Sequence, residues 1–244
     1  MISAPILAAV LAIVFLAGLV RGAFGFGDAL LGMPLLALFV PLAFATPLMA
    51  LVGPTLAVLI LIKEWRSMDV RGAGVLIAST IAGIPVGLFG LKHVDARIVN
   101  LILAAVIILF ALYNLLRPGL LRLRTARSAP LFGFAAGILG AAYNTNGPPV
   151  IFYGALRGWP PESFRATLQG YFLPTGSAIL IGQGIAGMLR KPVLTTYLYA
   201  LPVLALAVAL GRAIGSRIPA AKHAGWIYAL MLAAGAVLLV KTIL

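Results

Sequence analysis

Two short stretches carry the residues that can bind an ion in an otherwise apolar chain. The first, GFGDALLGMP at residues 25–34, holds three glycines, a proline and the carboxylate of Asp28, with Arg21 just upstream. The second, GILGAAYNTNGPPVIFYG at residues 137–154, holds an Asn-Thr-Asn run before two adjacent prolines. Glycine and proline interrupt helices, and the N-terminus of an interrupted helix favours an anion. Both stretches therefore predict the binding of a small anion.

Eleven residues in or near these stretches are candidates for contacting that anion. Small anions are held by cationic side chains, by backbone amides at helix N-termini, and by amide or hydroxyl side chains. A glutamine and a threonine from a later apolar segment join the set, because both are polar groups on a segment expected to lie in the membrane. The predicted substrate-binding residues are Arg21, Gly25, Phe26, Gly27, Asp28, Asn144, Thr145, Asn146, Gly147, Gln169 and Thr175.

The polar residues of the two stretches have more than one interpretation. Arg21 attracts the anion and Asp28 carries a coupled proton, or the two form a salt bridge, since an ionised carboxylate in a membrane is costly unless it is paired. The asparagines Asn144 and Asn146 bind the anion or cap the interrupted helices. Gln169 shares a helix face with Gln183, fourteen residues further on, and either lines a path or makes packing hydrogen bonds.

The composition indicates which class of protein must position these residues. The 244 residues are 63% hydrophobic and 9% charged, whereas a soluble domain is nearer a quarter charged. Apolar segments of roughly 20 residues, the length that crosses a bilayer as a helix, recur along the whole chain. We therefore predict an all-α polytopic protein of the cell (inner) membrane, in contact with the lipid bilayer and without a soluble domain.

Several other functions are disfavoured by the sequence. The net charge of +13 lies mainly in short gaps between apolar segments, so it predicts membrane orientation rather than nucleic-acid binding. With no cysteine and with His93 and His223 both in predicted loops, no metal site or cofactor is expected. The sequence has no Ser-His-Asp set, paired catalytic carboxylates or phosphate loop. We expect a protein that is not an enzyme and is driven by a gradient.

The order of the segments occurs twice, one interrupted segment followed by three intact ones. The segments fall at about 3–40, 44–62, 72–91 and 97–116, then at 131–156, 166–187, 193–211 and 224–243. A basic linker, RPGLLRLRTARSAP at 117–130, separates the two sets. We predict one membrane domain made of an N-terminal repeat, 1–116, the linker, and a C-terminal repeat, 131–244.

Glycines and prolines of the interrupted segments match at an offset of 115 residues. Five such matches within 17 positions favour duplication over chance, although glycine is common where membrane helices pack closely. The matched residues are Gly18, Gly22, Gly25, Gly32 and Pro34 in the first half, and Gly133, Gly137, Gly140, Gly147 and Pro149 in the second. Paired interruptions in two halves are typical of the central binding site of a transporter.

The positive charges favour a re-entrant form for each interrupted segment. If each segment enters and leaves on one side, Lys and Arg in the loops divide 12 to 5; if each crosses fully, they divide 10 to 7. The positive-inside rule prefers the first division. Three crossings per half then invert the second half relative to the first, and the linker faces the cytoplasm. Against this form, residues 3–20 alone are long enough to span.

The two interrupted stretches resemble the signature regions of a known family. GLVRGAFGFGDALLGMPLL and GFAAGILGAAYNTNGPPVIFYGAL are similar to those of the TauE/SafE family of sulfite and organosulfonate exporters, and the two-half layout extends the resemblance over nearly the whole chain. The family often has a glycine where this chain has Asp28, which leaves the substrate and the coupling ion open. A related thiosulfate-uptake branch relies on cysteines, and this chain has none.

Together with the resemblance, these patterns predict a secondary transporter. Its substrate is a small sulfur-containing anion, such as sulfite, sulfoacetate or a similar sulfonate, bound at the paired interruptions near the midplane and exported, with a possible coupled proton. The alternatives are a transporter of a small carboxylate, an intramembrane enzyme, and a non-transporting membrane assembly protein. The sequence leaves the anion, the direction of transport and the oligomeric state open.

Overall fold

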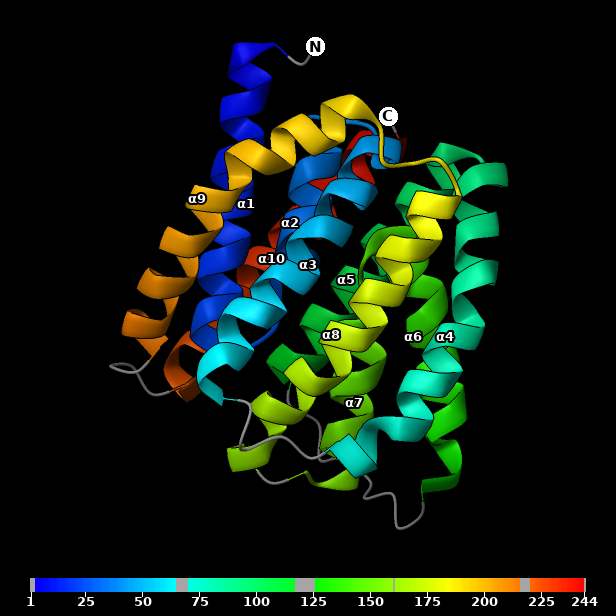
Figure 1. Cartoon of the computed structure of the whole chain (residues 1–244), viewed down its shortest axis with the longest axis vertical. Coiled ribbons are helices and arrows are strands. Elements are labelled where there is room, and N and C mark those ends of the chain that lie inside the picture. The colour runs from blue at the N-terminus through cyan, green and yellow to red at the C-terminus, as the bar shows by residue number, and fades with distance from the viewer. Residues whose placement is uncertain (1–2, 65–69, 117–125, 160, 216–219, 244) are drawn as a thin grey trace.

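The protein is a bundle of helices in the computed structural model, which describes residues 3–64, 70–116, 126–159, 161–215 and 220–243 (Figure 1). No strand occurs within these ranges, and most of the predicted linker lies outside them. The elements are α1 (Ala4–Phe24), α2 (Asp28–Ala37), α3 (Leu42–Glu64), α4 (Val70–His93), α5 (Ala96–Leu116), η2 (Ala126–Ser128), α6 (Ala129–Tyr143), α7 (Gly147–Arg157), α8 (Pro161–Ile185), α9 (Lys191–Gly215) and α10 (Ala220–Ile243).

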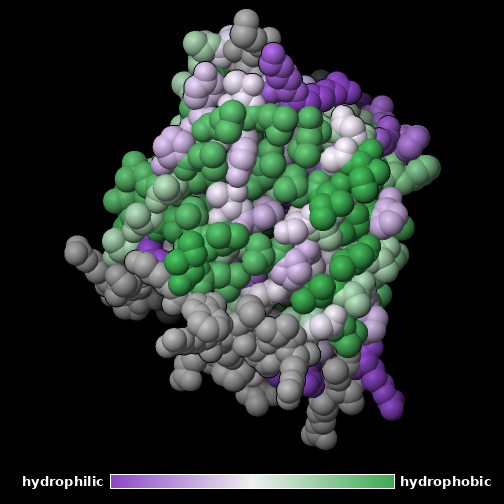
Figure 2. Space-filling model, in the orientation of Figure 1, coloured by the Kyte–Doolittle hydropathy of each residue, from purple (hydrophilic) through white to green (hydrophobic). Residues whose placement is uncertain are grey.

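The prediction of a helical membrane protein is confirmed. Five helices in the described ranges are long and apolar enough to cross a membrane: α1, α5 and α9 entire, and residues 42–62 of α3 and 73–93 of α4. Large apolar side chains such as Ile62, Ile185 and Leu198 are mostly exposed. Figure 2 shows hydrophobic residues across the middle of one face and hydrophilic residues towards its two ends, as expected for a bundle surrounded by lipid.

Two predicted crossings, α8 and α10, are not among these five helices, and in α10 the apolar stretch that the structure describes covers Tyr228–Ile243. The sequence of α8 includes Thr167, Gln169, Thr175 and Gln183, which lower its mean hydropathy, and all four are buried. A helix face that packs against other helices can carry polar residues that a lipid-facing surface cannot. The four polar side chains therefore lie where α8 packs against its neighbours, while Ile181 and Ile185 of the same helix are exposed.

Each interrupted segment turns back on itself as a helical hairpin. In the first, α2 returns along α1, so that a Cβ on Gly32 would lie 3.4 Å from the Cβ of Ala17. In the second, α7 returns along α6, and the rings of Phe132 and Tyr153 have centroids 5.5 Å apart. A hairpin is the shape expected of a re-entrant segment, and α1 by itself is also long enough to cross a membrane. The two arms of the first hairpin differ in length, since α1 has 21 residues and α2 has 10. The first turns of α1 therefore extend beyond the neighbouring helices (Figure 1).

Three loop or terminal contacts place several segments at one end of the bundle, where the N- and C-termini also lie (Figure 1). Each contact joins a basic side chain of one segment to a backbone carbonyl of another. They run from Lys92 to Ala186, from Arg97 to Ile243, and from Lys241 to Leu38. The α2–α3, α4–α5 and α8–α9 connections therefore share an end with the C-terminus.

Glycines allow two pairs of helices to approach closely. A Cβ added to Gly83 of α4 would overlap the carbonyl of Phe134 in α6, and one added to Gly211 of α9 would overlap the carbonyl of Leu19 in α1. Small residues at such crossings let membrane helices pack backbone to backbone. When the helices of the two halves are matched in chain order, α1 corresponds to α6 and α4 to α9. The pair α1–α9 therefore corresponds to the pair α6–α4.

The contact residues also correspond between the halves. A Cβ on Gly22 would meet Val208, and one on Gly137 would meet Thr80. The offsets are 137 − 22 = 115 and 208 − 80 = 128. The offset of 115 does not continue across the interruptions, because Gly25 caps α1 and Asn144 caps α6, and 144 − 25 = 119. The second hairpin thus has about one more helical turn before its break.

Candidate functional site

The two hairpins break at three-residue turns that need left-handed backbone. Gly25 and Gly27 have φ values of 82° and 98°, which residues with side chains rarely adopt. Asn144, with φ 53°, occupies the corresponding place in the second hairpin and is the only described residue other than glycine with positive φ. The glycines and the asparagine of the two motifs therefore form the turns themselves, whatever else they contact.

The turns and the first residues of α2 and α7 enclose a cavity of about 30 Å³. A single water requires roughly 10–15 Å³ of such space, so the cavity has room for a few heavy atoms. Eight of the predicted residues line it: Arg21, Phe26, Gly27, Asp28, Asn144, Thr145, Asn146 and Gly147. The other three lie just behind the lining. Gln169 bonds Arg21, Thr175 bonds Asn146, and the carbonyl of Gly25 accepts a hydrogen bond from Gln169.

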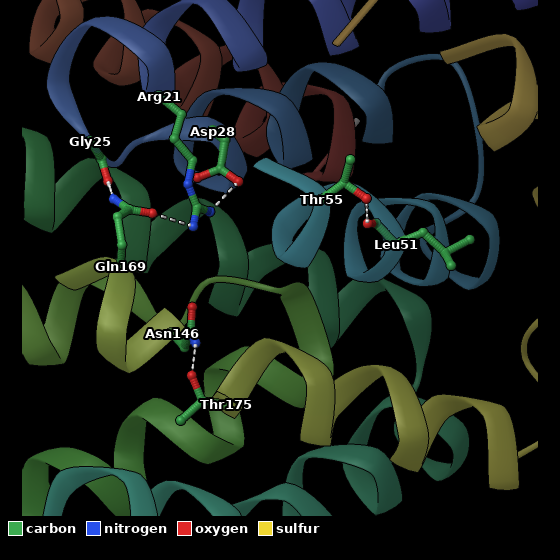
Figure 3. A network of polar contacts seen from close by, with 8 residues as sticks. All are labelled: Arg21, Gly25, Asp28, Leu51, Thr55, Asn146, Gln169 and Thr175. Carbon is green, nitrogen blue, oxygen red and sulfur yellow. Dashed lines mark hydrogen bonds and ion pairs between the residues drawn. The ribbon is translucent and has the colours of Figure 1, made fainter. Parts of the chain in front are cut away.

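Arg21 is the charged centre of this site. Its Nη1 lies 2.8 Å from Oδ2 of Asp28, and its Nη2 donates to Oε1 of Gln169 at 3.0 Å (Figure 3). The ring of Phe172 lies 4.8 Å from its Cζ, within the range of a cation–π contact. Nε of Arg21 is buried and has no hydrogen-bond partner. A buried donor on a cation is costly when unpaired, so this atom is suited to donate a hydrogen bond to an oxygen of a ligand.

The local charge at the cavity is positive in spite of the carboxylate. Arg21 and Asp28 are both buried and neutralise one another. The N-termini of α2 and α7 both open onto the cavity, and each adds the positive end of a helix dipole. Because prolines 148 and 149 have no N–H, the amides of Asn146 and Gly147 are the ones that α7 offers.

The second half stabilises the break of the first half. The amide nitrogen of Gln169, on α8, donates to the carbonyl of Gly25, while its oxygen accepts from Arg21 (Figure 3). In the same way, a residue of the first half forms hydrogen bonds with the break of the second half. Asn144 donates to the carbonyl of Thr46 on α3, and the Thr46 hydroxyl donates to the carbonyl of Ala142 at 3.2 Å.

A chain of buried polar groups continues from the cavity into the bundle. Asn146 donates to Thr175 at 3.2 Å, and the Thr175 hydroxyl donates to the Tyr171 carbonyl at 2.7 Å. The Tyr171 hydroxyl lies 2.8 Å from that of Thr80, which bonds the Gly133 carbonyl. Asn146 therefore has a hydrogen-bonding role within the protein as well as a place in the cavity wall.

Two further polar residues of the apolar segments, Gln183 and Thr55, lie away from the cavity. Gln183 is fully buried and donates to the Ala141 carbonyl at 3.2 Å. Thr55 bonds the Leu51 carbonyl and the Tyr197 hydroxyl, at 2.8 and 2.6 Å. Both make packing hydrogen bonds, and neither is among the residues that line the site.

Sequence reasoning missed the apolar wall of the cavity. This wall comes from α3, α7 and α8, and its members have no polar group that would mark them. They are Met49, Gly53, Pro54, Ile151, Phe172, Gly176 and Ile179, with Ala29 and Leu30 of α2 beside them. The one available signal was the spacing on α8, where 169, 172, 176 and 179 fall on one helix face. In the described part of the chain no group of three His, Asp or Glu residues could hold a metal.

Comparison with known proteins identifies the family. A family model described as "Sulfite exporter TauE/SafE" matches residues 10–239, nearly the whole chain. The chain belongs to the TauE/SafE family. A relative named as a probable sulfite/organosulfonate exporter TauE, from Cupriavidus necator, is 29% identical over 150 residues, which cover 61% of this chain and 58% of the relative. No solved structure matches the chain.

Family membership and the apolar helices together make this TauE/SafE chain a multi-pass membrane protein of an exporter family. The matched range includes the first hairpin from residue 10 onward, the whole second hairpin, and the helices α3 and α8 that contact them. The resemblance seen in the two motifs is thus confirmed. What the cavity binds, and how binding is coupled to movement, are questions for its own geometry.

Proposed function

We propose that this TauE/SafE chain is a secondary transporter that binds a small sulfur-containing anion, sulfite or a compact sulfonate, between its two hairpins and exports it. The observation that best supports this proposal is the buried Nε of Arg21, which has no hydrogen-bond partner and lies in a cavity bordered by the N-termini of α2 and α7. A cation and two helix dipoles that converge on one cavity favour an anion. A pair of interrupted helices at the interface of two halves is the usual place for a transporter's substrate.

Asp28 gives this site a means of coupling to protons. Its carboxylate and the substrate compete for the same guanidinium, because Arg21 already donates to Asp28 at 2.8 Å. A proton on Asp28 would cancel its charge and leave Arg21 free for the anion. Proton and anion would then bind and move together, so an anion that leaves the cell down its own gradient would carry the proton out with it.

The paired helix contacts support an inverted relation between the two halves. α1 packs parallel to α9, and α6 parallel to α4, through corresponding glycines, while the two hairpins start from opposite ends of the bundle in Figure 1. In such a repeat, each half can open the central site to one side of the membrane. Alternating exposure of the cavity would follow from exchanging the two arrangements.

Anion-dependent thermal stabilisation of the purified protein in detergent tests the proposal. Sulfite, methanesulfonate and sulfoacetate should raise the unfolding midpoint, and acetate should raise it less. The matched variant is Arg21→Gln combined with Asp28→Asn, because Arg21→Gln alone strands a buried carboxylate at about 3–5 kcal/mol. We expect the double variant to fold without any anion response. Stabilisation by acetate alone would favour a carboxylate transporter, and no response to any anion in the wild type would favour a non-transporting role.

A further inference from the structure

We propose that Phe172 limits the size of the anion, so that the cavity accepts compact sulfur oxyanions and rejects sulfonates with bulky tails. This inference rests on the proposed function, since it assigns the selectivity of the same cavity. It narrows the substrate class to an anion of few heavy atoms, such as sulfite or methanesulfonate.

Phe172 lies beside both groups that would hold the anion. Its ring is 4.8 Å from the Cζ of Arg21, and its Cζ would lie 3.6 Å from a Cβ on Gly147, the first residue of α7. The side chain is 6% exposed and lines the cavity. An oxyanion that reaches both Arg21 and the start of α7 therefore has the ring against it, and any substituent on sulfur must pass the ring.

The ring is held in place on more than one side. It packs edge to face on Tyr171, with centroids 5.5 Å apart, and Tyr171 is fully buried with its hydroxyl 2.8 Å from that of Thr80. Swinging the ring aside would also remove it from the face of the buried Arg21. Movement of the Phe172 side chain is therefore unfavourable, because it breaks the contacts with Tyr171 and Arg21.

The remaining walls give little additional room. The cavity measures about 30 Å³, two to three times the roughly 10–15 Å³ that one water needs. Ile179 closes another side and is itself packed against Gly140, where an added Cβ would lie 2.7 Å from its Cδ1. A sulfur oxyanion without a tail fits such a space with little movement of the lining. An aromatic sulfonate requires the loss or displacement of a large side chain.

The test compares two sulfonates that carry the same charged group. Dissociation constants for methanesulfonate and benzenesulfonate are measured from thermal shifts of the purified full chain in detergent, with sulfite as the reference anion. In the wild type we expect benzenesulfonate to bind at least about tenfold more weakly, since even one methylene of misfit is worth that much. Phe172→Ala should reduce this ratio at least about tenfold by opening the wall.

Two variants separate size from other effects of the ring. Phe172→Leu removes the aromatic face over Arg21 but keeps most of the bulk, so both sulfonates should weaken by a similar factor and the ratio should hold. Phe164 lies on the same helix but packs against Trp159, with ring centroids 6.1 Å apart, and does not line the cavity. Phe164→Ala should therefore leave the ratio of the two dissociation constants unchanged. If Phe172→Ala does not fold, Phe172→Val supplies the same comparison with a smaller truncation.

Each outcome has a distinct meaning. A smaller ratio in the truncated variants, with the ratio kept in Phe172→Leu and Phe164→Ala, supports the inference. An unchanged ratio in Phe172→Ala or Phe172→Val, or equal binding of both sulfonates by the wild type, overturns it while the proposed function stands. If neither sulfonate nor sulfite stabilises the wild type, the proposed function and the inference both fail.

Discussion

Arg21 combines three kinds of contact in one buried side chain. It forms an ion pair with Asp28, donates a hydrogen bond to the side-chain oxygen of Gln169, and lies against the ring of Phe172. The two interpretations that the sequence left open for Arg21 and Asp28, a salt bridge and an anion site, are therefore compatible. The salt bridge uses one edge of the guanidinium, and Nε remains for a ligand.

At this scale, Asp28→Asn tests whether Asp28 carries the coupled proton. Asparagine keeps an oxygen for Arg21 but has no charge to compete with the anion. We expect about tenfold tighter binding of methanesulfonate, which corresponds to about 1.4 kcal/mol. If Asp28 carries the coupled proton, the affinity of the wild type for methanesulfonate should depend on pH, and the affinity of the variant should not.

Transport measurements complete this test. In vesicles, Asp28→Asn should move the anion without responding to an imposed pH gradient, whereas the wild type responds. Transport by the variant that still follows the pH gradient would show that another group carries the proton.

At the scale of the elements, the half-helices and the glycine contacts decide how the site is built. Glycine crossings hold α1 against α9 and α6 against α4, and the short helices α2 and α7 continue from α1 and α6 across the turns that line the cavity. The positions of the two turns therefore depend on these backbone contacts as well as on the site residues themselves.

The glycine crossings predict a matched pair of destabilising substitutions. Gly83→Ala and Gly211→Ala should each lower the free energy of unfolding by about 1–3 kcal/mol, because an added Cβ overlaps a backbone carbonyl in each case. The midpoint of thermal unfolding in detergent should fall by about 2–4 °C for each kcal/mol. The two losses should add, since the sites are in different helix pairs.

Gly90→Ala is the control for this pair. Gly90 is on the same helix as Gly83, and nothing lies within 4 Å of a Cβ added there. Alanine is the better helix former, so the midpoint should stay or rise. A loss at Gly90 equal to that at Gly83 would mean that helix propensity, not close packing, determines the result.

The sequence predicted the elements of the site better than their partners. Glycine, proline and asparagine at residues 25–34 and 144–149 located both breaks, because backbone conformation is coded by the residues that adopt it. The apolar wall was not predictable in this way. Which side chain of α8 faces Arg21 depends on the packing of helices far apart in sequence, and Phe172 looks like any other apolar residue of a membrane helix.

At the scale of the whole molecule, the two ends of the bundle differ in charge. The end that holds the termini carries Lys and Arg residues of the α4–α5 and α8–α9 connections and of α10, five in all: Lys92, Arg97, Arg190, Lys191 and Lys241. The sequence assigns twelve others to loops at the opposite end. By the positive-inside rule we expect the end with the termini to face outwards.

Single cysteines in this cysteine-free chain test the orientation. Val94→Cys, between α4 and α5, should react with an impermeant thiol reagent in intact cells. Arg127→Cys, at an exposed position just before α6, should react only after the membrane is permeabilised. The reverse pattern of labelling would contradict this orientation, and labelling of both residues from outside would contradict the two-ended arrangement.

The exchanged hydrogen bonds at the two breaks have a consequence for how the gene can change. Gln169 of the second half completes the turn at Gly25, and Thr46 of the first half completes the turn at Asn144. Neither half contains everything that its own break needs. If the two halves arose by the predicted duplication, the copies cannot diverge independently, because a substitution in one alters the turn of the other. A chain cut in the linker would have to reunite both pieces before either binding turn is complete.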